Sequence, residues 1–299
     1  MPVPVSPDSS SAKARTAPRQ LNCRDRALLL DGRPKLVGIV NVTEDSFFDG
    51  GQHATADAAV AHALTLVGEG AAMIDIGGES TRPGFTAIPP EEEAARVAPV
   101  IAALVAKTKV PLSIDTYKSA VARTALRAGA HVLNDIRGFQ GDPALPDIAA
   151  EAGCAVILMH NLSLMHNDVS FRTTPGDIIA KLLEFFEQSL AIAAQAGVVR
   201  DKLVLDPGIG FGKNQEQNLE LLARLGELNV LGLPLLLGAS RKSFIGTTLA
   251  LPAAERLEGT LATTALAVWQ GVEFIRVHDV RANDRAARMA AAIRTSIKP

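Results

Sequence analysis

Polar and charged side chains recur in this chain where short apolar runs stop. The clearest case begins at Leu203–Leu205, an apolar run of strand type that Asp206-Pro-Gly ends abruptly. Alternating glycines follow, with Phe211 and Lys213 as a flat apolar face and a cation. Asp-Pro-Gly alone is typical of a turn. The interpretation as a ligand site therefore depends on the other strand-like runs.

Most of those runs also end in polar residues. The ends are Asn41, the stretch 77–84, Asp115, Asn134-Asp135, Met159-His160, Asp206, the stretch 240–243 and the stretch 276–279. Singly each is weak evidence, because Asn134 could cap a turn and Asp115 could cap a helix. Together they predict one shared site, since enzymes with parallel strands keep their chemistry at the carboxyl ends of those strands.

The residue types divide this site into two halves. Asp115, Asn134 and Asp206 suit a flat heterocycle with several N–H donors, because ionised carboxylates only accept hydrogen bonds. The other half is rich in cations and donors, which suits a phosphorylated group. Its members are Arg82, Lys242, Arg276, His278, Asn41, Thr81 and Ser243. A heterocycle joined to a phosphate ester is the substrate that this composition implies.

The elements that must position these residues alternate between strand and helix. The expected strands are 36–42, 72–77, 112–116, 131–136, 155–160, 203–206, 234–239 and 274–278. The expected helices are 55–69, 91–107, 118–128, 144–152, 176–196, 215–229, 256–270 and 280–296. Glycines such as Gly129 and Gly153 stand just past helical stretches, where a left-handed residue ends a helix.

Eight such units in about 260 residues predict an α/β protein, a (β/α)8 TIM barrel. A doubly wound sheet is the competing fold. The barrel is favoured because polar residues end almost every strand, whereas a doubly wound sheet concentrates its site at one switch point.

Composition and charge limit the classes of binding partner that the chain is expected to have. The chain has 299 residues, 47% of them hydrophobic, and a net charge of −2, which gives no electrostatic footprint for nucleic acid or an anionic membrane. The 2 cysteines cannot form a disulfide framework and fit a reducing compartment. No apolar stretch reaches a membrane span of roughly 18 residues, and no signal peptide is evident. We therefore expect a cytoplasmic protein with small-molecule partners.

The amino-terminal region divides into two parts. Residues 1–19 are rich in Pro, Ser, Ala and basic residues, and are expected to form a flexible leader. A single barrel domain is expected over 20–299. Its first segment, Leu21–Pro34, contains an Asp31-Gly32 turn between apolar pieces, which predicts a small hairpin that could plug one end of a barrel.

Seven motifs resemble the dihydropteroate synthase family, in order and at family spacing, over about Leu36 to Val280. They are Asn41–Gly51, Gly77–Gly84, Ser113–Thr116, Asn134–Ile136, Asp206–Lys213, Ser240–Phe244 and Arg276–Asp279. The resemblance implies a (β/α)8 barrel, a homodimer and a transferase of folate biosynthesis that is a sulfonamide target. Such an enzyme condenses 6-hydroxymethyl-7,8-dihydropterin pyrophosphate with 4-aminobenzoate, giving 7,8-dihydropteroate and pyrophosphate, with Mg²⁺.

The resemblance also implies roles for single residues. Those implied as catalytic are Asn41, Asp115, Asp206, Lys242, Arg276 and His278. The pterin would be held by Asp115, Asn134, Asp206 and Lys242, with Ile136, Met159, Phe211 and Gly238 around it. Pyrophosphate would bind Asn41, Arg276 and His278, and Mg²⁺ would bind Asn41, Asp45 and Asp49. The aminobenzoate would be framed by Thr81, Arg82, Pro83, Phe211, Lys242 and Ser243.

Three departures from the family pattern stand out. Glu44 replaces a usual proline, which should alter the stiffness of the first loop. Asn161–Asn167 replaces an Arg-Gly-Thr-Pro-like stretch, and the leader has no counterpart. None of these changes the expected pocket residues.

Two alternatives remain, and the second of them belongs to a different functional class. Corrinoid-linked methyltransferases use a related pterin-binding barrel, but they have no evident need for the cationic motifs at 240–244 and 276–279. A non-catalytic pterin-binding protein is the second alternative. Formation of product from both substrates would distinguish an enzyme from it.

Overall fold

The structure is a computed structural model that describes residues 19–42, 51–79, 87–161 and 177–296, without the side chains of 19 and 51–55. The expected leader lies outside the described residues except for Arg19, where the first strand begins. Within these ranges, no helix is both long enough and apolar enough to cross a membrane.

Eight parallel strands form the centre of the molecule, in the order β8-β7-β6-β5-β4-β3-β10-β9. Their bounds are β3 Lys35–Asn41, β4 Met73–Gly77, β5 Leu112–Asp115, β6 Val132–Asp135, β7 Ala155–Met159, β8 Leu203–Asp206, β9 Leu236–Leu237 and β10 Phe274–Val277. A parallel bridge between Leu205 and Leu235 joins the two ends of this order. The sheet therefore closes into a barrel. This confirms the predicted (β/α)8 barrel and excludes the doubly wound sheet.

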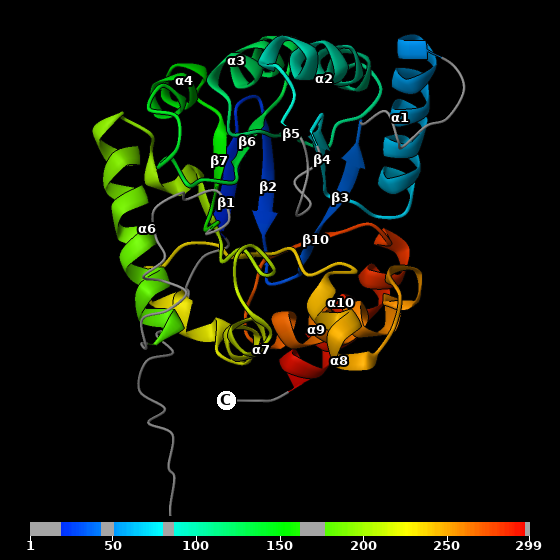
Figure 1. The fold of residues 1–299 in the computed structure, drawn as a ribbon, viewed down its shortest axis with the longest axis vertical. Coiled ribbons are helices and arrows are strands. Elements are labelled where there is room, and N and C mark those ends of the chain that lie inside the picture. Colours follow the sequence, from blue (N-terminus) through cyan, green and yellow to red (C-terminus); the bar gives the residue numbers. More distant parts are fainter. Residues whose placement is uncertain (1–18, 43–50, 80–86, 162–176, 297–299) are drawn as a thin grey trace, which may run out of the picture.

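Helices surround the strands (Figure 1). They are α1 Gly51–Gly68, α2 Pro90–Val105, α3 Ser119–Ala128, α4 Leu145–Ala152, α6 Ile178–Gln195, α7 Gln215–Ala223, α8 Ser243–Leu249, α9 Leu257–Trp269 and α10 Val280–Ser296. Short 3-10 turns complete them: η2 Arg200–Lys202, η3 Leu225–Leu231 and η4 Ala253–Glu255. Gly129 and Gly153 follow α3 and α4 in the left-handed conformation, as expected.

The structure departs from the predicted elements at three places. The helix expected over 215–229 ends at Ala223, and a 3-10 turn containing Gly226 replaces its second half. The strand expected over 234–239 is only two residues long, because Pro234 has no N–H to donate to a neighbouring strand. Helix α8 was not predicted, since its short sequence follows a motif that was interpreted only for its chemistry.

The expected hairpin exists, but its predicted turn was wrong. Strand β1 (Arg19–Cys23) pairs with β2 (Arg26–Leu30) so that Cys23 is opposite Arg26, which puts the turn at Arg24-Asp25 and not at Asp31-Gly32. Arg24 holds a left-handed φ of 60°. Its Nη1 donates to the carbonyl oxygens of Leu126 (2.9 Å) and Ala130 (2.7 Å). These tertiary bonds anchor an unfavourable turn residue that no local signal marks.

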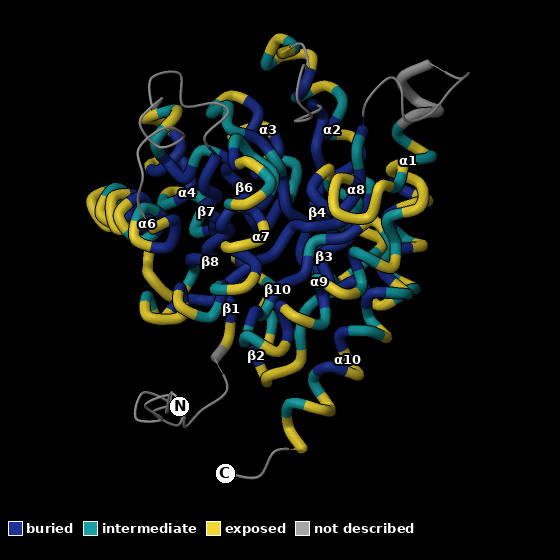
Figure 2. Tube along the Cα trace, turned by 60° about the horizontal axis from the view of Figure 1, so that its bottom comes forward, coloured by how far each residue is buried: buried dark blue, intermediate teal, exposed yellow. Residues whose placement is uncertain are grey.

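The core has two layers on opposite faces of the barrel wall. One joins the hairpin to inward strand residues such as Met73, Val204 and Phe274. The other fills the space between the strands and the helices, as the buried strands and outward-exposed helical turns in Figure 2 illustrate. Because strand side chains alternate between the two faces, every second residue of each strand points into the barrel.

Gly208 tests how tightly the turn after β8 is packed. It has a φ of +66°, and an added Cβ would lie 1.8 Å from the carbonyl oxygen of His160. We expect Gly208→Ala to lower the free energy of unfolding by about 3 kcal/mol or more, from left-handed strain plus overpacking. Gly32 is the matched control, because its φ is +84° with nothing within 4 Å of an added Cβ. Equal losses in urea unfolding of Gly208→Ala and Gly32→Ala would contradict this packing.

Candidate active site

The predicted polar strand ends converge at the carboxyl end of the barrel. In the strand register, Gly77 is opposite Asp115, Asp115 is opposite Asn134, and Met159 is opposite Asp206. The alternation that turns Asp115 and Asn134 inward turns Asp135 outward, where its carboxylate accepts the N–H groups of Arg137 and Phe139.

One guanidinium group organises the interior. Arg276 Nε donates to Asp75 Oδ2 at 2.6 Å, and its Nη2 donates to Asp115 Oδ2 at 2.8 Å. Asn134 Nδ2 donates to the same Asp75 oxygen at 3.0 Å. Two nitrogens of Arg276 are therefore committed to carboxylates in the half of the site that contains Asp115, whereas the sequence analysis placed Arg276 with the cations of the other half.

Three oxygen atoms of this group have no hydrogen-bond partner within the described part of the chain. They are Asp75 Oδ1, Asp115 Oδ1 and Asn134 Oδ1, all buried. A buried acceptor without a donor costs about 1–3 kcal/mol, so such groups normally have a partner. A ligand that presents several N–H donors would supply these partners.

Burial shifts the proton equilibrium of Asp115. Loss of solvent raises its pKa from 3.8 to about 7, although the charge of Arg276 opposes the shift. The neighbouring charges of Asp75, Glu93 and Asp206 raise the pKa further. The carboxyl therefore changes charge near neutral pH.

Asp206 lies across the pocket at the end of β8. Its Oδ1 accepts the N–H of Gly208 at 2.8 Å, which fixes the carboxylate to the turn. Its Oδ2 lies 3.8 Å from the place a Cβ would take on Gly238, so the glycine leaves room beside the carboxylate. Burial raises the pKa of Asp206, and the charge of Lys242 opposes that rise.

Lys242 and Phe211 meet above this carboxylate. The Lys242 Nζ lies 4.3 Å from the centre of the Phe211 ring and donates to the carbonyl oxygen of Ile209. An added Cβ on Gly210 would lie 3.0 Å from Lys242 Cδ, so the glycine permits this approach. Burial lowers the pKa of Lys242 to about 8, against the charge of Asp206.

Lys213 has a structural environment that its motif did not reveal. Its buried Nζ is 2.9 Å from His160 Nδ1 and donates to the carbonyl oxygen of Gly208 at 2.9 Å. Burial lowers its pKa to about 7, while Asp206 opposes this. Lys213 therefore ties the turn after β8 to the end of β7.

The charged groups described above at the barrel mouth balance one another when every group is ionised. Three carboxylates face three cations: Asp75, Asp115 and Asp206 with Lys213, Lys242 and Arg276. Because Asp115 and Lys213 both titrate near neutrality, this balance depends on pH and on any charged ligand.

The outer part of the mouth carries further predicted residues. His278 is exposed, with Nδ1 2.9 Å from Ser240 Oγ, and Ser243 is exposed at the first residue of α8. Asn41 ends β3, and its Oδ1 lies 3.9 Å from the place a Cβ would take on Gly77. Arg241 is not part of this set, since it forms an ion pair with Asp279.

Other predicted residues have a position but no described contact with the pocket. Met159 is buried at the end of β7, and Ile136 is buried just after β6. The alternation places both on the inward face. Thr81, Arg82, Pro83, Asp45 and Asp49 lie outside the described residues.

Of the metal ligands expected from the sequence, Asn41 lies within the described residues, and Asp45 and Asp49 lie outside them. Among the described residues, no group of three or more His, Cys, Asp or Glu side chains could hold a metal ion. Asn41 places an amide oxygen at the mouth, and oxygen atoms are the ligands that Mg²⁺ prefers. The donor type at this position therefore fits the expected ion.

Asp75 is the functional residue that the sequence analysis missed. It is fully buried within Met73-Ile-Asp-Ile-Gly77, and it binds both Arg276 and Asn134. One signal could have found it. A carboxylate inside an otherwise apolar buried strand requires a partner, and it shares the inward face with Gly77.

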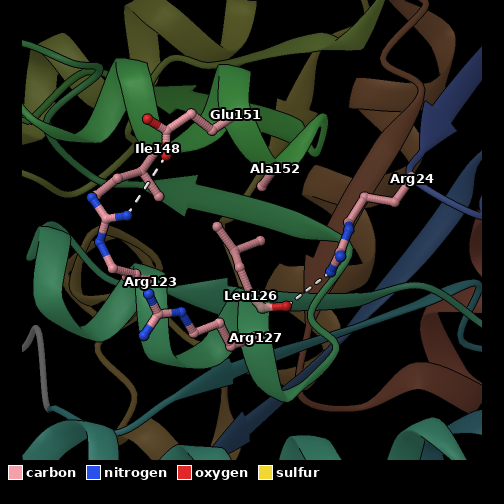
Figure 3. A pocket seen from close by; sticks show the side chains of 7 residues that line it. All are labelled: Arg24, Arg123, Leu126, Arg127, Ile148, Glu151 and Ala152. Carbon is pink, nitrogen blue, oxygen red and sulfur yellow. Dashed lines mark hydrogen bonds and ion pairs between the residues drawn. The ribbon is translucent and has the colours of Figure 1, made fainter.

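A separate pocket of about 290 Å³ lies between α3, α4 and the hairpin (Figure 3). Arg24, Arg123 and Arg127 line it, with Glu151 paired to Arg123 at 3.6 Å. The carboxyl-terminal ends of α3 and α4 adjoin it, so it is near the amino ends of the strands. It is therefore distinct from the site at the mouth.

Comparison with known proteins agrees with this geometry. The sequence model for the pterin binding enzyme family matches residues 37–278. The dihydropteroate synthase of Clostridium beijerinckii is 45% identical over 262 residues, 87% of this chain and 94% of that protein. That of Escherichia coli strain K12 is 45% identical over 261 residues, 87% of this chain and 91% of that protein.

Solved structures give the same result. Xanthomonas albilineans dihydropteroate synthase with 4-aminobenzoic acid has 43% identity and a TM-score of 0.87, covering 94% of this chain and 100% of that one. Yersinia pestis dihydropteroate synthase with a sulfonamide drug has 43% identity and a TM-score of 0.84, covering 92% and 99%. The chain belongs to the pterin binding enzyme family, among the dihydropteroate synthases.

Proposed function

We propose that the barrel mouth condenses 6-hydroxymethyl-7,8-dihydropterin pyrophosphate with 4-aminobenzoate, giving 7,8-dihydropteroate and pyrophosphate. The observation that carries this assignment is the set of unpartnered acceptors, Asp115 Oδ1 and Asn134 Oδ1, on the same inner surface as Asp206. A pterin ring presents amino and ring N–H donors to such acceptors.

The pterin half of the site binds and orients the ring. Asp115, Asn134 and Asp206 accept its N–H groups, while Gly238 leaves space for the ring beside the backbone. Lys242 and Phe211 form the opposite boundary, where a cation and an aromatic face lie 4.3 Å apart. The 4-aminobenzoate would bind at the outer side of this pair, next to Ser243.

The outer half takes the pyrophosphate. Asn41, Arg276 and His278 would bind its oxygens and stabilise the negative charge that develops as the C–O bond breaks. With Asp45 and Asp49, Asn41 would also hold Mg²⁺, which supplies further positive charge to the departing pyrophosphate.

The residues at the pterin explain why the bond can break before the new one forms. Loss of pyrophosphate leaves positive charge on the pterin methylene, which the electron-rich ring and the nearby carboxylates of Asp115 and Asp206 stabilise. The aniline nitrogen of 4-aminobenzoate then attacks and loses a proton. Because that nitrogen becomes strongly acidic on attack, no strong general base is needed.

Sulfonamide binding follows from the same assignment, and the cysteines bear on the location in the cell. The Yersinia pestis relative binds a sulfonamide drug, and we propose that this chain binds such drugs in its aminobenzoate site. Cys23 and Cys154 are buried free thiols, which supports the proposed cytoplasmic location because thiols persist in reducing compartments.

The decisive experiment is incubation of the protein with both substrates and Mg²⁺, followed by chromatographic detection of dihydropteroate and pyrophosphate. Equal amounts of the two products are expected. Omission of 4-aminobenzoate should abolish dihydropteroate. Pterin binding without product would instead indicate the non-catalytic pterin-binding alternative.

Asp206→Asn tests the pterin half. The amide oxygen can still accept the N–H of Gly208, so the fold should persist. An NH2 group, which donates, replaces the second carboxylate oxygen. We expect pterin affinity to fall by about 1.5–3 kcal/mol, the value of a hydrogen bond to a charged group. Calorimetry measures this. Asp31→Asn is the matched control, because Asp31 Oδ1 likewise accepts the backbone N–H of the residue two positions later, Arg33, but at the hairpin end of the barrel. Unchanged affinity in Asp206→Asn would remove Asp206 from the site.

The pH dependence of pterin binding tests Asp115. Its pKa of about 7 in the unliganded protein means that protonation below pH 7 removes the charged acceptor. The dissociation constant should therefore rise toward tenfold per unit as pH falls below 7, after correction for titration of the pterin. Asp115→Asn should bind the pterin weakly, and its dissociation constant should not rise in this way below pH 7. A rise below pH 7 that persists in this variant would assign the titration to another group.

We also propose a homodimer that uses α9 and α10. Four large apolar side chains are exposed there: Leu266 (40%), Trp269 (49%), Met289 (61%) and Ile293 (47%). The two helices meet near this surface, because Arg294 donates to the carbonyl oxygen of Val268. Exposed apolar side chains on neighbouring helices favour association.

Trp269→Glu should shift the protein from dimer to monomer in sedimentation velocity. Trp269 is also the chain's 1 tryptophan, so dilution of the unaltered dimer should change its fluorescence. Val230→Glu is the control, since Val230 is 75% exposed on η3 instead. A dimer that survives Trp269→Glu would place the interface elsewhere.

A further inference from the structure

A second group of buried charges lies next to the pterin pocket, and none of its members has a role in the steps described above. We call it the Lys118 cluster: Glu79, Glu93, Tyr117 and Lys118. Lys118 Nζ lies 2.6 Å from Glu79 Oε2 and 2.7 Å from Glu93 Oε2, and these side chains are only 12%, 4% and 1% exposed. Charged side chains at this depth are rare unless they are paired, and here each is paired with Lys118 or is Lys118 itself.

The cluster holds the backbone of one distant residue, Ile88. The N–H of Ile88 donates to Glu79 Oε2 at 2.8 Å, and its carbonyl oxygen accepts from Lys118 Nζ at 2.8 Å. Tyr117 Oη donates to the other Glu79 oxygen at 2.9 Å. Glu79 and Ile88 are thus bonded to each other, and they flank the stretch 80–87.

The surrounding packing is built for these contacts. A Cβ on Gly78 would lie 2.8 Å from Val97 and 3.1 Å from the carbonyl oxygen of Glu93, so a larger residue would displace α2. Burial alone would lower the pKa of Lys118, but its bonds to Glu79 and Glu93 outweigh burial and raise it. Lys118 therefore remains a cation at neutral pH. Arg137 also stacks on the Tyr117 ring, at 4.4 Å.

The cluster is joined to the pterin pocket by a very short path. Lys118 is three positions after Asp115, on the turn between β5 and α3, and Gly77 is opposite Asp115 in the sheet. Two of the three chain segments that make the cluster, those of Glu79 and of Tyr117-Lys118, therefore begin at the pocket wall. The stretch 80–87 contains Thr81, Arg82 and Pro83, which family resemblance assigns to the aminobenzoate.

We propose that Glu79 and Lys118 are positioning residues that hold Ile88 beside Glu79, on either side of the stretch 80–87, and thereby set the affinity for 4-aminobenzoate. This inference rests on the proposed function. It assigns the two residues no contact with either substrate.

The test compares substrate constants in matched lysine variants. Lys118→Met should raise the KM for 4-aminobenzoate at least tenfold, while the dissociation constant of the pterin stays within twofold. Lys118→Arg keeps the cation and should recover part of the loss. Lys202→Met is the control, because Lys202 Nζ also binds a backbone carbonyl oxygen, that of Gly153, but before β8 at the opposite end of the barrel.

A second variant distinguishes a specific effect on 4-aminobenzoate from misfolding. Tyr117→Phe removes only the hydroxyl that binds Glu79, and it should raise the same KM severalfold with little change in melting temperature. An unchanged aminobenzoate KM in both Lys118→Met and Tyr117→Phe would overturn the proposal. A parallel loss of pterin affinity would also overturn it, since that would indicate general damage.

Hydrogen exchange separates this inference from the proposed function. The Ile88 amide should exchange faster in Lys118→Met than in the unaltered protein or in Lys202→Met, because Glu79 loses the cation that holds its carboxylate. If the unaltered protein makes no dihydropteroate, the proposed function fails, whereas Ile88 exchange still reports on the cluster. Unchanged exchange at Ile88 would refute the fastening itself.

Discussion

The ion pairs of Arg276 are the constraint on which the rest of the site depends. A guanidinium that bridges Asp75 and Asp115 allows two carboxylates to coexist on the inner face of a barrel. Removing one partner from a buried pair of this kind typically costs about 3–5 kcal/mol, because the remaining charge is left uncompensated. Arg276 thus keeps two acceptors close together in a place from which water is largely excluded. A ligand with several N–H groups can then bind acceptors that already point inward.

The barrel supplies the geometry that this arrangement needs. Parallel strands place successive inward residues at matched heights, so Asp115 and Asn134 lie side by side although they belong to different strands. At the other end, the hairpin packs Leu21 and Cys23 against inward residues such as Phe274. One end of the barrel interior is therefore apolar and filled, whereas the opposite end collects the charges. This separation explains why the pKa values of Asp115 and Lys242 shift so far from their ordinary ranges.

Backbone details bring the two sides of the site together. The turn after β8 approaches the carbonyl oxygen of His160 so closely that only glycine fits at 208. Lys213 reinforces this contact by binding both the Gly208 carbonyl oxygen and His160. The Lys118 cluster has an equivalent position after β4 and β5, where it fastens Ile88. In both cases a buried lysine binds backbone carbonyl oxygens and fixes the connection that follows a strand.

The sequence by itself determined the repeated strand and helix pattern, the barrel and most of the pocket. These follow from local signals, because apolar runs, glycines at helix ends and polar residues at strand ends are all visible within a few positions. Asp115, Asn134 and Asp206 could be assigned to one site for the same reason. Only the tertiary structure decided which charges pair. Asp75 and Arg276 are far apart in the chain, and the turn of the hairpin at Arg24 depends on carbonyl oxygens of Leu126 and Ala130. Such long-range contacts have no local sequence signal, since their energy arises only when folding brings the partners together in a medium of low polarity.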